Sequence, residues 1–308
     1  MKFDAILLVA FGGPEKPEDI LPFLRQVTAG RQIPEERLEE VRRHYEAIGG
    51  RSPLNEWTRR QAAALAIELR HRGHAPRVSC GMRNWHPFVG ESLESLYESG
   101  RREVLAVILS VQDSEAGRAR YLEALSAART ELAERAPNVT IAAAWHERPG
   151  FAQAAADRIR FACRELDEDQ QHEATLVFTA HSIPTEMANA SDYEAQIRAT
   201  AAATAALLGR EDFELAWQSR SGRPQAPWLE PDIGDKLEEL AAAGCRRAII
   251  EPIGFVCDHI EVLWDLDHEA RQRAEAAGIE MIRAGTVADH PAFISMIADV
   301  VIDESASA

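Results

Sequence analysis

The stretch Ala5-Ile6-Leu7-Leu8-Val9-Ala10-Phe11-Gly12-Gly13-Pro14 sets the fold class of this chain. Its run Ala5–Phe11 is apolar throughout, which is typical of a strand covered on both faces in a parallel sheet. The glycines that follow lack the Gly-x-Gly-x-x-Gly spacing, and the chain has no Gly-Lys pair of a nucleotide-binding loop. We therefore interpret Gly12 and Gly13 as a tight turn that lets a ligand or another backbone segment approach closely.

Apolar runs of this kind alternate with amphipathic segments along the 308 residues. The alternation predicts an α/β fold built from βα units. Eight strands of this length fit two sheets of about four strands better than one sheet of eight. The expected strands are Ala5–Phe11, Val78–Met82, Val104–Ser110, Thr140–Trp145, Thr175–Ala180, Glu214–Trp217, Ala248–Ile253 and Glu280–Ile282.

The segment Glu147-Arg148-Pro149-Gly150 is the expected boundary between two domains, because it lies near the midpoint. Residues 1–148 with a C-terminal helix in 289–308 would form the first domain, and residues 149–288 the second. Asn55 and Asp232 are expected to begin helices. The expected helices are Glu35–Ile48, Glu56–Arg72, Arg118–Glu134, Phe151–Leu166, Asp192–Leu208, Ile233–Ala243 and His290–Asp303.

The net charge of −16 repels phosphate backbones, which argues against nucleic acid as a partner. No apolar run approaches the roughly 20 residues that a membrane span needs, and the N-terminus shows no signal-peptide cleavage pattern. We therefore expect a cytoplasmic protein without a transmembrane segment. No Cys-x-x-Cys pair occurs among its four cysteines, which predicts reduced thiols and no iron–sulfur cluster. The cysteines are Cys80, Cys163, Cys245 and Cys257.

His181 lies where the expected strand Thr175–Ala180 ends, followed by Pro184. Ligands gather at the carboxyl ends of strands in such sheets. A neutral imidazole there can bind a borderline metal ion or accept a proton near neutral pH. The alternative is a loop histidine that hydrogen-bonds to the backbone.

Three acids, Glu261, Asp265 and Glu269, follow the stretch Gly254–His259 at intervals of four residues. On a regular helix they would form one acidic stripe, which repulsion between like charges disfavours. Asp258 would begin this helix, with Glu261 completing a capping box. Capping does not explain Asp265 and Glu269. They form either a solvated face or a relay that carries protons or a cation.

A long loop, Trp217–Leu229, contains two tryptophans with Arg220 and Arg223. Aromatic and guanidinium groups together suit a flat anionic ligand. A surface loop braced by prolines is the alternative.

Five ordered segments make the chain resemble the ferrochelatase family, in the form found in actinobacteria. The resemblance extends from about residue 3 to 303, nearly the whole chain. The segments are Leu7–Pro14, Ile48–Leu54, Phe178–Pro184, Trp217–Pro231 and Pro252–Asp267.

This resemblance implies two similar Rossmann-like domains with a porphyrin cleft between them. It implies an enzyme of haem b biosynthesis that inserts Fe²⁺, as a substrate, into a porphyrin, without an obligatory cofactor. Coproporphyrin III is the favoured porphyrin, with protoporphyrin IX as the alternative. A cobalt or iron chelatase of another tetrapyrrole and a non-catalytic haem carrier are weaker alternatives. Other haem-pathway enzymes are the expected protein partners.

By the same resemblance, His181 and Glu261 form the iron and proton-transfer site. From the spacing of the acids, we expect Asp265 and Glu269 to extend this site as a relay for protons or iron. The porphyrin-binding positions are Ser52, Tyr121, Phe11 and Tyr45. The chain also departs from relatives of the firmicute type. Phe11 replaces a tyrosine over the metal, and Gln112 stands where many members have histidine. Thr28 and His44 replace arginines, which leaves open how the propionates are held.

Overall fold

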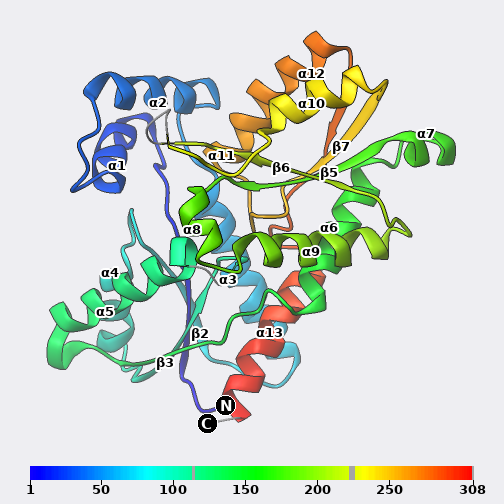
Figure 1. The fold of residues 1–308 in the computed structure, drawn as a ribbon. Helices are drawn as coiled ribbons and strands as arrows, with labels where there is room; N and C mark the ends of the chain where they lie inside the picture. Colours follow the sequence, from blue (N-terminus) through cyan, green and yellow to red (C-terminus); the bar gives the residue numbers. More distant parts are fainter. Residues whose placement is uncertain (113–114, 222–225, 307–308) are drawn as a thin grey trace. The chain divides into compact units, whose positions relative to one another are not determined.

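The computed structural model describes residues 1–112, 115–221 and 226–306, which form two α/β units (Figure 1). The first unit contains Met1–Ser110, Gly117–Trp145 and Ile294–Ala308. The second unit contains Val111–Ala116 and His146–Phe293. The two Rossmann-like domains expected from the sequence are therefore present.

A four-stranded parallel sheet with the order β2-β1-β3-β4 forms the centre of the first unit. All six residues of β1 are buried, because β2 and β3 pair with its two edges and helices pack on the faces of the sheet. The strands are β1 (Ala5–Ala10), β2 (Arg77–Met82), β3 (Glu103–Ile108) and β4 (Asn138–Ile141). The helices of this part are η1 (Pro17–Asp19), α1 (Ile20–Val27), α2 (Glu35–Ala47), α3 (Leu54–His71), α4 (Val89–Glu98), the π-helical η2 (Glu115–Ala119), α5 (Arg120–Leu132) and η3 (Ala133–Arg135).

The second unit also contains a four-stranded parallel sheet, with the order β6-β5-β7-β8. In both sheets the first strand of the unit lies between the second and the third, and the fourth lies at the edge beside the third. The strands are β5 (Thr175–His181), β6 (Glu214–Gln218), β7 (Arg247–Glu251) and β8 (Glu280–Arg283). Helices α10 and α12 lie side by side on this unit (Figure 1). The helices are α6 (Pro149–Ala162), α7 (Glu168–Glu173), α8 (Thr185–Asn189), α9 (Tyr193–Leu207), α10 (Ile233–Ala242), α11 (Ile260–Leu263), the π-helical η4 (Asp265–Ala270) and α12 (Arg271–Ala277).

The eight expected strands are confirmed, with one displaced. The expected strand Thr140–Trp145 is observed as β4, which begins at Asn138 and ends at Ile141. Trp145 lies outside the strand, where its indole nitrogen donates to the carbonyl oxygen of Ile108 at 2.9 Å. Burial of the large indole explains why this segment is apolar beyond the strand itself.

The expected start of a helix at Asn55 is wrong, because α3 begins at Leu54 and Pro53 is its N-cap. The Asn55 side chain instead binds the glycine turn after β1, accepting from the Gly13 amide at 3.0 Å. A Cβ atom on Gly13 would lie 2.6 Å from the Cβ of Ser52. A Cβ atom on Gly12 would lie 3.1 Å from the backbone nitrogen of Trp85, so the expected close approach of another backbone segment at this turn is present. By contrast, Asp232 does cap its helix, accepting from the Gly234 amide at 2.8 Å.

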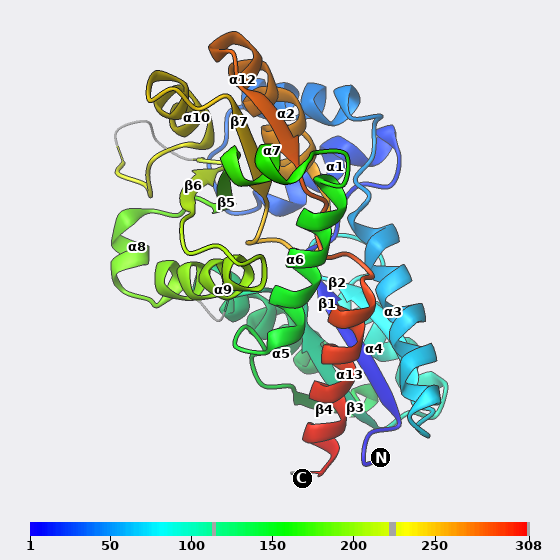
Figure 2. The same cartoon turned by 90° about the vertical axis from the view of Figure 1, so that its right-hand side faces the viewer.

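The last helix, α13 (Pro291–Ala306), extends along the first unit from Ile294 onward (Figure 2). Arg72, the C-cap residue of α3, binds Asp299 at 2.6 Å, and the Ala143 amide donates to Glu304 at 2.7 Å. The domain boundaries predicted from the sequence differ from the boundaries of the two units at residues 111–116, 146–148 and 289–293. The predicted boundaries stay a prediction. None of the helices within the described residues is both long and apolar enough to cross a membrane.

Candidate active site

His181 is the last residue of β5, which lies between β6 and β7 in the second sheet. The backbone around it is held by two contacts. The Ser182 amide donates to the carbonyl oxygen of Gln218 at 2.7 Å, and the Tyr193 hydroxyl donates to the carbonyl oxygen of His181 at 2.9 Å. The imidazole is therefore presented at the carboxyl end of a central strand, where ligands gather in such sheets.

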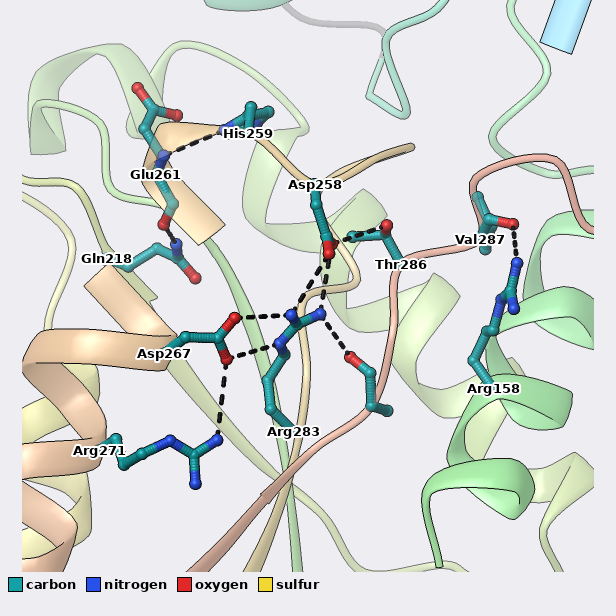
Figure 3. Close-up of polar contacts among 11 residues, drawn as sticks. Arg158, Gln218, Asp258, His259, Glu261, Asp267, Arg271, Arg283, Thr286 and Val287 are labelled. Atoms are coloured by element: carbon teal, nitrogen blue, oxygen red, sulfur yellow. Dashed lines mark hydrogen bonds and ion pairs between the residues drawn. The ribbon is translucent and has the colours of Figure 1, made fainter. Parts of the chain in front are cut away.

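Glu261 lies in the first turn of α11, and two side chains hold its backbone (Figure 3). The Glu261 amide donates to Nδ1 of His259 at 3.1 Å, so His259 is the N-cap of this short helix. The side-chain amide of Gln218 donates to the carbonyl oxygen of Glu261. Because Gln218 ends β6, these bonds tie the helix that carries Glu261 to the strand beside His181.

The two side chains meet, with Nε2 of His181 at 3.4 Å from Oε1 of Glu261. Nδ1 of His181 donates to the carbonyl oxygen of Ser182, so both ring nitrogens face oxygen acceptors. Burial by itself lowers the pKa of His181, but the charge and hydrogen bond of Glu261 outweigh it and raise the pKa to about 9. Burial raises the pKa of Glu261, but His181 lowers it to about 2. Near neutral pH the pair is an imidazolium beside a carboxylate.

This pair is expected to make stability depend on pH. The raised pKa of His181 stabilises the fold fully below about pH 6.5, and this contribution is lost as the pH rises through about 9. The lowered pKa of Glu261 stabilises the fold above about pH 4.5, and this contribution is lost as the pH falls toward about 2. The side chains are 31% and 38% exposed, so we expect about 1 kcal/mol at most.

Urea denaturation of the wild type and His181→Gln at pH 5.5 and pH 9.5 measures this contribution. The wild type is expected to be the more stable protein at pH 5.5, and the difference should vanish at pH 9.5. His71→Gln, at an exposed position, is the control and should show no such change. An equal difference at both pH values would contradict an ion pair at this site.

Asp265 and Glu269 continue from Glu261, but not on a regular helix as expected from the sequence. The chain turns into the π-helix η4 at Asp265, where the Glu269 amide donates to the carbonyl oxygen of Trp264 at 2.9 Å. Such π-helical turns are frequent at functional sites. Burial raises the pKa of Asp265 most, the Ser219 hydroxyl opposes it, and the charges of Glu261 and Glu269 add to the rise, to about 8. Glu269 is exposed, so the three carboxyl groups run from the pair outward.

Asp258 does not begin the helix, and the predicted capping box is wrong. Its carboxylate instead accepts from Thr286 at 2.9 Å and pairs with Arg283 at 3.2 Å (Figure 3). Arg283 also binds Asp267 of η4 at 2.7 Å. The guanidinium side chain is only 13% exposed, and a buried cation requires carboxylate partners. Arg283 therefore takes the carboxylate that capping would have used, and His259 caps α11.

The predicted ligand loop Trp217–Leu229 divides into parts with different surroundings. The Trp217 side chain is buried and packs against Tyr193, with ring centroids 6.0 Å apart. It therefore belongs to the core. Arg220 donates to the carbonyl oxygen of Ala226 at 2.9 Å, which braces the loop. Arg223 lies outside the described residues.

The predicted porphyrin-binding residues of the first unit are grouped around its strand ends. Phe11 and Tyr45 both pack edge-on against Phe23, with ring centroids 6.4 and 6.2 Å apart. Arg83 lies over the rings of Phe11 and Tyr121. Ser52 is buried beside the Gly13 turn, with its amide bound to Pro14 at 2.8 Å.

The residues that depart from the firmicute pattern are also placed. The Thr28 hydroxyl donates to the carbonyl oxygen of Leu24 at 2.7 Å and so ends α1. Gln112 is buried, and His44 lies in the last turn of α2. All four cysteines are free thiols, and the expectation of no iron–sulfur cluster stays a prediction.

Sequence reasoning missed four residues that build the site: Gln218, Ser219, His259 and Tyr193. Ser219 has a positive φ of 63° and donates its hydroxyl to Asp265. His259 carried a usable signal, since it immediately precedes the helix that contains Glu261. The other three contact residues far away in the chain, which no local pattern marks.

Two solved structures share this architecture. SirB from Bacillus subtilis with Fe³⁺ has a TM-score of 0.57 at 11% sequence identity, and the match covers 98% of this chain and 95% of that chain. CbiX, described as the terminal enzyme for biosynthesis of siroheme in denitrifying bacteria, has a TM-score of 0.55 at 16% identity, with 97% and 98% covered. At this identity the likeness shows the fold alone. The two sheets of identical strand order thus define a protein of the chelatase fold.

The chain belongs to the ferrochelatase family, whose model matches residues 3–305. The coproporphyrin III ferrochelatase of Mycolicibacterium smegmatis is 44% identical over 307 residues, which are 99% of this chain and 90% of that protein. The protein of the same description from Frankia alni is 44% identical over 310 residues, covering 97% of this chain and 79% of its own length. The family resemblance inferred from five motifs is confirmed.

Proposed function

We propose that this protein is a metal chelatase that inserts Fe²⁺ into coproporphyrin III, forming Fe-coproporphyrin III in haem b biosynthesis. The family membership supports iron insertion into a porphyrin. The descriptions of its relatives from actinobacteria favour coproporphyrin III over protoporphyrin IX.

The single observation that carries this proposal is the contact between His181 and Glu261. An imidazole and a carboxylate are both ligands for a borderline divalent metal. Among the described residues, no group of three or more histidine, cysteine or acidic side chains could hold a metal ion. A metal ion that is held permanently in a structural site, such as structural zinc, usually has four protein ligands. A pair of donors therefore suits a metal that is passed to the porphyrin nitrogens.

The contacts of the pair and the shifted pKa values of both side chains support a different role for each partner. Nδ1 of His181 is occupied by the Ser182 carbonyl oxygen, so Nε2 is the nitrogen that would present Fe²⁺ to the porphyrin. The proton on Nε2 must leave before the metal binds there. Glu261 is the ionised base beside it, and its pKa rises once the charge of His181 is gone.

Metal insertion also releases the N–H protons of the porphyrin, which need a route to solvent. Glu261 would accept these protons and pass them along Asp265 to the exposed Glu269. The raised pKa of Asp265, about 8, lets that carboxyl group hold and release a proton near neutral pH. The acidic series also counts against a non-catalytic carrier, because a carrier needs only an axial ligand.

Steady-state iron insertion by the full chain, with coproporphyrin III and protoporphyrin IX side by side, tests the proposal. We expect many turnovers per chain and kcat/KM at least about tenfold higher for coproporphyrin III, because its additional propionates can make charge-assisted hydrogen bonds. Insertion without turnover would indicate a carrier. Equal kcat/KM values would refute the preference for coproporphyrin III while leaving the enzyme class intact.

We further propose a cytoplasmic enzyme that works beside other haem-pathway enzymes. The net charge of −16 supports this location, since such a surface is repelled by anionic lipids. Fractionation of cells that produce the full chain tests it, and recovery with the membranes after a salt wash would contradict it.

A further inference from the structure

Arg83 is held at the carboxyl ends of two neighbouring strands of the first unit. It follows β2 directly, and its amide donates to the carbonyl oxygen of Ala10 at 2.9 Å. The next residue, Asn84, donates to the carbonyl oxygen of Phe11 through its backbone at 3.0 Å and through its side chain at 3.1 Å. These bonds fix the backbone from which the Arg83 side chain extends.

The guanidinium group of Arg83 lies over two aromatic rings. Its central carbon is 4.9 Å from the centroid of Phe11 and 5.5 Å from that of Tyr121. Its one hydrogen bond within the described residues goes from Nε to the Asn84 side chain at 3.3 Å. The two terminal nitrogens form no bond to a described residue. Since a guanidinium binds carboxylates through these nitrogens, the group is oriented and available for a planar anion.

The charged groups around Arg83 are mostly positive. No carboxylate of the described residues forms an ion pair with it, and Arg31 and Arg120 lie close enough to repel it. The acid that attracts it, Glu123, is also 3.7 Å from Arg120. Burial lowers the pKa of Arg83 most, and the two arginines add to this. An uncompensated, half-buried cation is unfavourable, and a bound carboxylate would offset that.

We propose that Arg83 binds a propionate carboxylate of the porphyrin and thereby favours porphyrins that carry more propionates. This inference rests on the proposed function and adds a specificity-determining residue to it. The rings of Phe11 and Tyr121 orient the guanidinium. Arg31 and Arg120 add positive charge that attracts the same kind of ligand. Thr28 and His44 stand where firmicute relatives have arginines. Arg83 would supply the guanidinium group for a propionate that these two positions lack.

Porphyrin binding by fluorescence, with the purified full chain, tests this proposal. The ligands are coproporphyrin III and its tetramethyl ester, both delivered in the same detergent buffer. Arg83→Gln is expected to raise the Kd for coproporphyrin III about 10- to 100-fold, which is the range for a lost charge-assisted hydrogen bond. Arg83→Lys should show a smaller loss, because it keeps the charge but lacks the planar fork. Neither variant should change the Kd for the uncharged ester.

The control is Arg164→Gln, which removes a guanidinium 4.2 Å from the ring centroid of Phe161 at an exposed position of the second unit. It should leave both Kd values unchanged. An unchanged Kd for coproporphyrin III in Arg83→Gln would overturn the proposal, and so would an equal loss of ester binding. If Arg83→Gln fails to fold, the same comparison with Arg83→Lys decides. A wild type that binds neither porphyrin would instead refute the proposed function.

Discussion

Replacing His181 with alanine is expected to lower the rate of iron insertion by about 10²- to 10⁴-fold, the range for loss of an acid–base group. The variant removes Nε2, the atom that lies 3.4 Å from Glu261. Glu261→Gln should have an effect of similar size, since it removes the base but keeps the shape. Porphyrin binding should remain measurable in both variants, because neither residue belongs to the group around Phe11.

Steady-state insertion rates and porphyrin fluorescence titrations measure the two effects separately. His71→Ala is the matched control, because this histidine is exposed at the end of α3. If His181→Ala and Glu261→Gln both insert iron at the rate of the wild type, the site lies elsewhere. If porphyrin binding is lost as well, the effect would not be specific to metal transfer.

Replacing Arg283 with methionine is expected to destabilise the fold by about 3–5 kcal/mol, because two partly buried carboxylates lose a buried cationic partner. Within the described residues, Asp267 would keep only the longer contact with Arg271, at 3.8 Å. Arg283 binds Asp267 through two nitrogens at 2.8 and 2.7 Å and Asp258 at 3.2 Å. Asp258 belongs to the segment before α11, and Asp267 to the π-helix after it. The substitution should therefore loosen both ends of the segment that carries Glu261, and insertion activity should fall with stability.

Urea denaturation followed by circular dichroism measures this effect, with Arg273→Met as the control. Arg273 also contacts three acids, Asp232, Asp235 and Glu238, but its side chain is 36% exposed. Water screens such pairs, so the control should lose at most about 1 kcal/mol. Equal losses in the two variants would show that burial does not set the strength of the Arg283 network.

The two sheets could be predicted from the sequence because an uninterrupted apolar run indicates a strand that is buried on both faces. Each central strand is covered on both faces, so β1 and β5 consist almost wholly of buried residues. The position of His181 at a strand end could be predicted for the same reason. The nature of the site could not, because a histidine after a strand is equally compatible with a backbone contact. Indeed His181 makes both contacts, one to Ser182 and one to Glu261.

The acidic series shows where local reasoning fails. Spacing by four residues predicted a regular helix from Glu261 to Glu269, whereas the chain forms a π-helix from Asp265. A capping pattern predicted that Asp258 begins the helix, whereas Arg283 binds that carboxylate. Both errors have one cause. A residue's strongest partner can be distant in the chain, and 25 positions separate Asp258 from Arg283.

By itself, then, the sequence determined where the strands lie along the chain, the family, and the types of residue at the metal site. Only the tertiary structure decided which groups meet: His181 with Glu261, Gln218 with the backbone of Glu261, and Arg83 with Phe11 and Tyr121. The physical reason is the range of each effect. Apolar runs and helix propensity can be recognised from residues adjacent in the chain, whereas protonation states and ion pairs depend on distances in space.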